Sequence, residues 1–519
     1  MKIVKSEDLV RTIPDGCTIA FTGFGGMGQC DRILMDIRRR FLETGHPKNL
    51  TIFHAAGQSD RNNGIEYLAE EGLIKRIIGG HWGLAPKIRK MIEDNKIDAY
   101  CLPQGQLTHL FRTIANGLPG QISPIGLGTF VDPRIDGGKF NERTKTKENL
   151  VEILTIDDQE YLFYKAISFD YVLIRGTSAD ENGNITTEEE PLKLEILSAA
   201  QAAKACGGKV IVQVKYLAKS GTFHPKEVVI PGYLVDYVVI AENPMEEHRQ
   251  IPNCVYHPVY SGELRVPVEQ ATPLPMSVRK IIGRRAVQEL TKNAVVNLGI
   301  GIPGDVIGPI TVEEGLNSDI ILTIESGIIG GVPIGSNQFG IAKNAEVILD
   351  HGSQFDHYHG AGVDLAFMGA AEVDRFGNVN VSKFGNRSVG CGGFIDVTQP
   401  AKKVIFCTTF TTGGLEVEID RGKIRILQEG KNKKFVSDVN QITFSGKYAA
   451  KHDKKVIYVT ERAVFQLTLE GLELVEIAPG IDLERDILGQ MDFQPKISDH
   501  LKLMDPRIFQ PSPMELIMT

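Results

Sequence analysis

The sequence predicts an α/β protein made of two related Rossmann-like domains, each with a mostly parallel sheet covered by helices. Three features support this fold class. Apolar strand patterns alternate with helical patterns, a glycine-rich turn lies near the start of each half, and segments of the first half recur in the second. Strands that alternate with helices form parallel sheets, because each crossover helix returns the chain to the same edge of the sheet.

The internal repeat consists of three pairs of matching segments. One pair joins an apolar strand to a glycine loop, the second joins a strand to a Gly-Asn turn and a further strand, and the third is a strand that begins with Lys-Val-Ile. We interpret these pairs as the duplication of one α/β unit. In the same order, they are residues 17–28 and 294–304, residues 170–185 and 364–379, and residues 209–214 and 403–408.

The segment after the first glycine loop has the spacing of an amphipathic helix. Its apolar residues recur from Ile33 to Phe41. Asp31 is a residue type that caps helix N-termini, and Gly45 is a type that ends helices. We therefore expect a helix that is capped by Asp31 and stops near Gly45.

A proline-rich stretch separates the two halves. Six prolines lie between about Glu242 and Met276, and proline disfavours both helices and central strands. We predict an N-terminal domain at residues 1–245, a linker at residues 246–276, and a C-terminal domain at residues 277–519 that carries the catalytic acid described below.

Composition and charge exclude several classes of protein. Of the 519 residues, 42% are apolar and 24% are charged, as in ordinary globular proteins. A net charge of −8 offers no basic field for nucleic acid. The first eight residues carry charges where a signal peptide is apolar, and no apolar run reaches the length of a membrane span. The seven cysteines form no C-x-x-C pair, so we expect a cytoplasmic enzyme.

Glu325 is the most informative residue of the chain. A run of apolar residues from Ile321 ends on this acid, and Ser326 and Gly327 follow at once. The pattern places the carboxylate at the carboxyl end of a strand, where open α/β sheets hold their ligands, and the glycine allows a substrate to approach closely. A fixed and partly desolvated carboxylate suits a nucleophile. A glutamate with only a structural role in a turn is the alternative.

Two loops satisfy the pattern G-x-G-x-x-G, at residues 23–28 and 299–304. This pattern is typical of dinucleotide-binding sites. An acid at the end of the next strand, as Glu325 is, would hold the ribose of a nicotinamide cofactor, so an oxidoreductase is one alternative. A more general interpretation is that backbone N–H groups of these loops hold an anion or an oxyanion.

A third glycine loop, residues 389–396, has four small residues before Phe394. Such a run requires close packing or a closely bound ligand. Together with Glu325, this loop indicates a nucleophile that faces a set of backbone hydrogen-bond donors.

These motifs together resemble the family I coenzyme A transferases, specifically the single-chain acetate/propionate type, over nearly the full length. Glu-Ser-Gly at Glu325 is similar to that branch, whereas many 3-oxoacid transferases have Glu-Asn-Gly. Residues 22–30 lack the proline of the 3-oxoacid signature G-G-F-x-x-x-G-x-P. The matching stretches are Glu325-Ser-Gly with its flanks, Gly390-x-Gly-Gly-Phe394, Asn297-Leu-Gly-Ile-Gly-Ile-Pro303, Gly126-Leu-Gly-Thr-Phe-Val-Asp-Pro133, Gln441-Ile-Thr-Phe444 and Ile477-Ala-Pro-Gly-Ile-Asp482.

The resemblance implies that CoA is transferred between a short-chain acyl-CoA and a short-chain carboxylate such as acetate, propionate or butyrate. It implies a ping-pong mechanism through a thioester between CoA and Glu325, with no external base because a carboxylate is ionised at pH 7. CoA is then a substrate, and no cofactor or metal is needed. The resemblance assigns Glu325 as the nucleophile, Gly392, Gly393 and Gln104 as oxyanion donors, and Gly299, Ile300, Gly301 and Gly390 as CoA contacts.

The expected partners are acyl-CoA and carboxylate substrates, with no nucleic acid and no membrane, and we expect a homo-oligomer, taken to be a tetramer. An acyl-CoA hydrolase on the same scaffold is a further alternative. One group of acidic and histidine residues fits no zinc spacing, and we do not assign it as a metal site. Its members are Asp350, His351, Asp356, His357 and His359.

Overall fold

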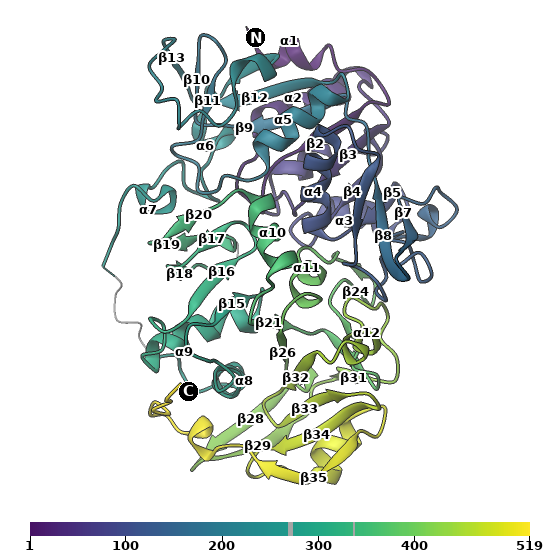
Figure 1. Ribbon diagram of the computed structural model, residues 1–519, viewed down its shortest axis with the longest axis vertical. Helices are drawn as coiled ribbons and strands as arrows, with labels where there is room; N and C mark the ends of the chain where they lie inside the picture. The colour runs from purple at the N-terminus through teal and green to yellow at the C-terminus, as the bar shows by residue number, and fades with distance from the viewer. Residues whose placement is uncertain (268–272, 336–337, 519) are drawn as a thin grey trace.

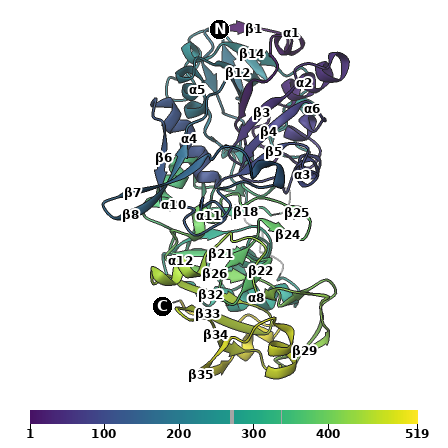
Figure 2. The same ribbon diagram turned by 90° about the vertical axis from the view of Figure 1, so that its right-hand side faces the viewer.

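Two α/β halves are stacked along the long axis of the molecule in the computed structural model, which describes residues 1–267, 273–335 and 338–518 (Figure 1). The first half (residues 1–267) and the second half (residues 273–518) each contain one large sheet. A small sheet of β6 (Gly120–Ser123), β7 (Val151–Ile156) and β8 (Gln159–Lys165) extends from the side of the first half (Figure 2). Within the described ranges, no helix has the length and apolarity needed to cross a lipid bilayer.

The large sheet of the first half has eight strands, and all neighbouring strands in it are parallel. Its central strands are nearly continuous apolar runs, as expected where helices cover both faces. In order across the sheet, the strands are β1 (Lys2–Ile3), β14 (Tyr237–Ile240), β12 (Lys209–Val214), β9 (Tyr171–Arg175), β2 (Thr18–Phe21), β3 (Leu50–His54), β4 (Ile74–Gly79) and β5 (Asp98–Cys101). The helices are α1 (Ser6–Val10), α2 (Asp31–Thr44), α3 (Pro86–Glu93), α4 (Gln104–Ala115), α5 (Ile196–Ala205), α6 (Pro244–Glu247) and α7 (Pro258–Ser261).

The large sheet of the second half has ten strands, with a parallel block at its centre and antiparallel pairs toward both edges. In order, the strands are β20 (Val347–Ile348), β17 (Ile328–Ile329), β16 (Ile321–Ile324), β15 (Val295–Leu298), β21 (Leu365–Gly369), β26 (Lys403–Cys407), β32 (Lys455–Val459), β33 (Ala463–Thr468), β34 (Gly471–Ile477) and β35 (Lys496–Leu503). The helices are α8 (Val278–Val287), α9 (Gly308–Glu313), α10 (His351–Gly360), α11 (Phe394–Thr398) and α12 (Gly446–Lys451).

The two large sheets share one topology at their centres. β2 lies between β3 and β9, and β15 lies between β16 and β21, so the strand order reverses at the same point in each half. Each half also has a three-stranded sheet: β11 (Ile185–Thr186), β10 (Ser178–Asp180) and β13 (Tyr216–Ala218) in the first, and β23 (Val379–Asn380), β22 (Glu372–Asp374) and β31 (Phe435–Val436) in the second. The predicted fold class is confirmed, and the strand order agrees with the predicted duplication.

One helix end differs from its prediction. Helix α2 begins at Asp31 itself, and Cys30 occupies the N-cap position without a capping hydrogen bond. The Asp31 carboxylate instead accepts a hydrogen bond from Gly64 N at 2.9 Å and pairs with Arg249 at 3.0 Å. These long-range partners explain why Asp31 is not the cap. The predicted stop is confirmed, since Gly45 ends the helix in a left-handed conformation.

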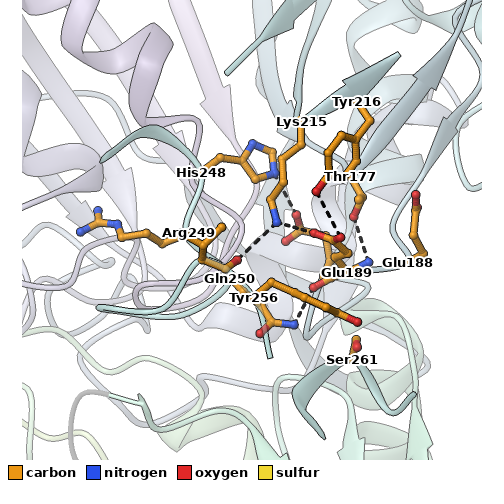
Figure 3. Close-up of polar contacts among 12 residues, drawn as sticks. Thr177, Glu188, Glu189, Lys215, Tyr216, His248, Arg249, Gln250, Tyr256 and Ser261 are labelled. Atoms are coloured by element: carbon orange, nitrogen blue, oxygen red, sulfur yellow. Dashed lines mark hydrogen bonds and ion pairs between the residues drawn. The ribbon is translucent and has the colours of Figure 1, made fainter. Parts of the chain in front are cut away.

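An ion-paired cluster covers the carboxyl ends of β9 and β12 in the first half. Arg175, the last residue of β9, lies 2.6 Å from Glu190. Lys215, directly after β12, pairs with Glu189, and both side chains lie at the centre of Figure 3. Gln250 donates a hydrogen bond to the backbone oxygen of Glu189 at 2.7 Å. The cluster thus ties the chain that follows β14 to the first sheet.

The linker was predicted at residues 246–276, and its beginning is therefore packed on the first half. Its residues 268–272 lie outside the described residues. The predicted ranges of the two domains, 1–245 and 277–519, stay predictions.

The contact between the halves is partly apolar. Ile324 and Ile328, which flank the Glu325 turn, and Cys391 and Ile395 of the third glycine loop belong to the buried apolar cluster of the first half. The segments that carry the predicted catalytic residues are thus packed into the core of the opposite half. This packing fixes the position of Glu325 relative to both sheets.

Candidate active site

Glu325 lies in a tight hairpin turn at the carboxyl end of β16. Ile324 of β16 pairs with Ile328 of β17, so only Glu325, Ser326 and Gly327 form the turn. Gly327 has a φ of 110°, and a Cβ atom there would lie 2.3 Å from the backbone oxygen of Leu349. Only glycine fits this position. The Glu-Ser-Gly motif thus has a steric cause, and the predicted strand-end location of the acid is confirmed.

The Glu325 carboxylate is short of polar partners. The side chain opens onto a cavity and is partly exposed, but its Oε2 atom is buried and has no hydrogen-bond partner among the described residues. Burial raises the pKa of Glu325 from its ordinary 4.5 to about 7, although the nearby His351 and Asn297 lower it. An unpartnered, buried carboxylate oxygen carries a large desolvation penalty, and this makes it a site for a ligand or a reaction.

This pKa corrects one expectation. A glutamate with a pKa of about 7 is less readily ionised at pH 7 than an ordinary glutamate, and the expectation of an ordinary carboxylate did not include this shift. The physical reason is desolvation between the two halves, which the local sequence does not reveal.

The third glycine loop is hydrogen-bonded to the first half. Trp82 N donates to the backbone oxygen of Val389 at 2.6 Å, and Gly392 N donates to that of Gly80 at 2.7 Å. In return, Gln104 N donates to the backbone oxygen of Gly392 at 3.0 Å. These bonds hold the loop against the segments that follow β4 and β5.

The two predicted backbone donors of this loop differ in their availability. The Gly392 N–H is engaged by Gly80, so it is not free to bind an oxyanion, contrary to expectation. The Gly393 N–H has no acceptor among the described residues. A Cβ atom on Gly393 would lie 3.4 Å from Cγ of Glu325, so this glycine lies directly beside the acid.

A cavity of about 410 Å³ lies where the carboxyl edges of the two sheets meet. Its volume is within the range of small-molecule sites in proteins. The predicted residues Gln104, Gly299, Ile300, Glu325, Gly390, Gly392 and Gly393 all line it. Gly301 does not; it lines a smaller hollow that shares Ile300 and Phe339 with the cavity.

The first half supplies cavity residues that were not assigned to the site from the sequence. Phe24 follows β2, Ala56 follows β3, and His81 and Leu84 follow β4. The rule that ligands lie at the carboxyl ends of parallel strands applies to the first sheet as well as to the second, and would have indicated these loops. Burial lowers the pKa of His81 to about 4, so this side chain is neutral at pH 7.

The acidic and histidine residues near position 350 have other partners. Asp350 caps α10 by accepting a hydrogen bond from Ser353 N, and Asp350 and Asp356 both pair with Arg112 at 2.5 Å. His359 lies 3.0 Å from the Asp396 carboxylate. Within the described ranges, no group of three or more such side chains is arranged to hold a metal ion.

Comparison with known proteins shows the family of the chain. The family model "Coenzyme A transferase" matches residues 4–241. A caffeate CoA-transferase of Acetobacterium woodii is 46% identical over 98% of this chain and 97% of its own length. The chain belongs to the coenzyme A transferase family.

The structures of this coenzyme A transferase and of a solved relative agree closely. The acetate CoA-transferase YdiF of Escherichia coli K12 is 45% identical over 99% of this chain and 96% of its own length. The apoenzyme of acyl-CoA transferase YdiF from E. coli O157:H7 has a TM-score of 0.94 at 45% identity, over 99% of this chain and 97% of that chain. The glycine loops are therefore those of a CoA-transferase, and the nicotinamide alternative is not supported.

We expect Glu325→Gln to raise the stability of the protein at alkaline pH. Because the folded-state pKa of about 7 lies above the ordinary 4.5, the unfolded chain loses its proton first as pH rises. Ionisation of Glu325 therefore lowers the free energy of unfolding between these values, by about 3 kcal/mol at most once pH exceeds 7. Below pH 4 this contribution is absent.

The measurement is the difference in thermal unfolding midpoint between Glu325→Gln and the parent from pH 4 to pH 8.5. This difference is expected to grow toward alkaline pH. Glu43→Gln, at an exposed position of α2, is the control and is expected to show no such trend. A constant difference for Glu325→Gln would contradict the raised pKa.

Proposed function

We propose that this CoA-transferase moves CoA between a short-chain acyl-CoA and a short-chain carboxylate, by a ping-pong mechanism through a thioester at Glu325. The observation that carries the proposal is the unpartnered Glu325 carboxylate oxygen in the cavity between the halves. One solved relative supports it: the thioester complex of E. coli O157:H7 YdiF with CoA has a TM-score of 0.92 at 44% identity, over 99% of this chain and 97% of that chain. Acetate is the named substrate of another relative.

The proposed reaction starts with attack of ionised Glu325 on the carbonyl carbon of acyl-CoA. The carbon–sulfur bond breaks, the CoA thiolate leaves, and an acyl-glutamyl anhydride forms. The thiolate then attacks the Glu325 carbonyl carbon, the anhydride carbon–oxygen bond breaks, and the first carboxylate leaves. A second carboxylate reverses both steps on the glutamyl-CoA thioester and departs as the new acyl-CoA. Four easier displacements thus replace one difficult exchange.

The surroundings of Glu325 suit this chemistry. Each attack places negative charge on a carbonyl oxygen, which needs a hydrogen-bond donor already in place. The Gly393 N–H beside Glu325 is our candidate donor, and Gln104 is a second. The apolar side chains of Phe24, Leu84 and Phe394 in the cavity wall limit the access of water, which would hydrolyse both intermediates.

A covalent CoA adduct is expected on Glu325 when the protein is incubated with acetyl-CoA and no second acid. Intact mass and peptide mapping detect it. Glu325→Gln is expected to form no adduct and to retain the fold, because the amide has the same shape but is a poor nucleophile. Adduct formation is expected to rise as pH increases through about 7, since the carboxylate is the reactive form. A protein that exchanges CoA without any adduct would contradict the mechanism.

Gly393→Ala is expected to slow transfer by about 10²-fold, similar to the loss of one oxyanion donor. The added methyl group would lie 3.4 Å from both Cγ of Glu325 and Cζ of Phe355, and so crowd the carboxylate. Turnover at saturating acyl-CoA is the measurement. Gly360→Ala is the matched control, because no atom lies within 4 Å of a Cβ at that position. Equal turnover in both variants would mean that the third glycine loop has only a packing role.

Acetate, propionate and butyrate are expected to be better acceptors than larger acids. A competition assay with equal concentrations of acetate, succinate and caffeate, analysed by mass spectrometry of the acyl-CoA products, tests this. Caffeate belongs in the assay because the relative named for it is as similar to this chain as the acetate enzyme is. A strong preference for caffeate or succinate would overturn the assignment to short-chain acids.

A further inference from the structure

A buried chain of three polar side chains leads from the first half through the second half to the cavity wall, and so crosses between the halves twice. Glu195, at the N-terminus of α5, lies 2.7 Å from Nδ1 of His351, at the start of α10. Nε2 of His351 lies 2.9 Å from Nε2 of Gln104, the first residue of α4. The Glu195 and His351 side chains are almost completely buried, and Gln104 lines the cavity beside Glu325.

The mechanism proposed above does not use Glu195 or His351. Both are nevertheless ionisable side chains, and buried charges are normally paired. His351 Nδ1 is the only hydrogen-bond partner of the Glu195 carboxylate among the described residues, because the Oε1 atom has none. The pairing fixes the ring, since Nδ1 must carry a proton to donate to the carboxylate.

Glu195 fixes the His351 ring so that Nε2 is the atom that faces Gln104. With the proton on Nδ1, Nε2 accepts a hydrogen bond from the Gln104 amide nitrogen at 2.9 Å. The amide oxygen lies 3.7 Å from a Cβ position on Gly392. The amide nitrogen has two N–H groups, so the second one remains for a ligand in the cavity.

We propose that Glu195 and His351 are positioning residues that hold the Gln104 carboxamide so that the second N–H of its NH₂ group donates to the substrate carbonyl oxygen next to Glu325. The inference rests on the proposed function, because it assigns the second oxyanion donor of that reaction.

The experiment is a double-mutant cycle on the rate of CoA adduct formation at Glu325 in single turnover. Glu195→Gln preserves shape and removes the charge, and we expect it to slow adduct formation about tenfold or more, because an oxyanion donor is misdirected. Acyl-CoA binding, measured by KM, is expected to change little. In a Gln104→Ala background, Glu195→Gln is expected to cause no further loss, since the residue on which it acts is gone.

His351→Gln removes the second positioning residue. It is expected to behave like Glu195→Gln, both in the parent protein and in the Gln104→Ala variant. His109→Gln is the matched control. His109 lies on α4, the helix that begins at Gln104, and it contacts the backbone oxygen of Gly352 at 3.1 Å across the same contact between the halves. Thermal unfolding midpoints of all variants report any loss of folding.

The outcomes separate the two proposals. If the parent forms no adduct, the proposed function fails. If the parent forms the adduct and Glu195→Gln reacts at the parent rate, or if the Glu195 and Gln104 losses are independent and multiply, the positioning pair is refuted. A slow Glu195→Gln variant, with no further loss in the Gln104→Ala background and with a normal His109→Gln control, supports it.

Discussion

The desolvation of Glu325 is the constraint on which the rest of the structure depends. A carboxylate at the end of an apolar strand would be well hydrated if its sheet stood alone. Here the first half covers it, one of its oxygens has no partner among the described residues, and its pKa rises to about 7. The same burial that opposes its charge leaves the carboxylate poorly solvated, which is the condition that the proposed attack on a thioester requires.

This burial requires that the two halves keep a fixed position relative to each other. Two kinds of contact hold them in that position. The apolar contact inserts Ile324, Ile328, Cys391 and Ile395 into the core of the first half. The polar contact joins the third glycine loop to the chain after β4 and β5 through backbone hydrogen bonds. Apolar packing contributes most of the stability, whereas the hydrogen bonds set the direction in which loop groups point.

The duplicated fold has been used differently in its two halves. In the second half, the carboxyl ends of β15, β16 and β21 open onto the cavity. In the first half, the ends of β9 and β12 are covered by ion pairs of Arg175 and Lys215. Among the described residues of this half, those that line the cavity all belong to the segments that follow β2, β3, β4 and β5. One half thus supplies the Glu325 carboxylate, and the other supplies part of the cavity wall and the Gln104 carboxamide. Neither half contains the whole site.

The sequence alone determined the fold class, the repeat and the position of Glu325 at the end of a strand. Strand and helix periodicities are local, and a Glu-Ser-Gly turn after an apolar strand has a steric cause within a few residues, so these features could be predicted. The tertiary structure alone decided the raised pKa of Glu325, the engagement of Gly392 N–H by Gly80, the cavity wall from Phe24 to Leu84, and the chain from Glu195 through His351 to Gln104. Each of these depends on contact between residues far apart in the chain. Solvent exclusion and hydrogen-bond direction are set by such contacts, and no local pattern of residues encodes them.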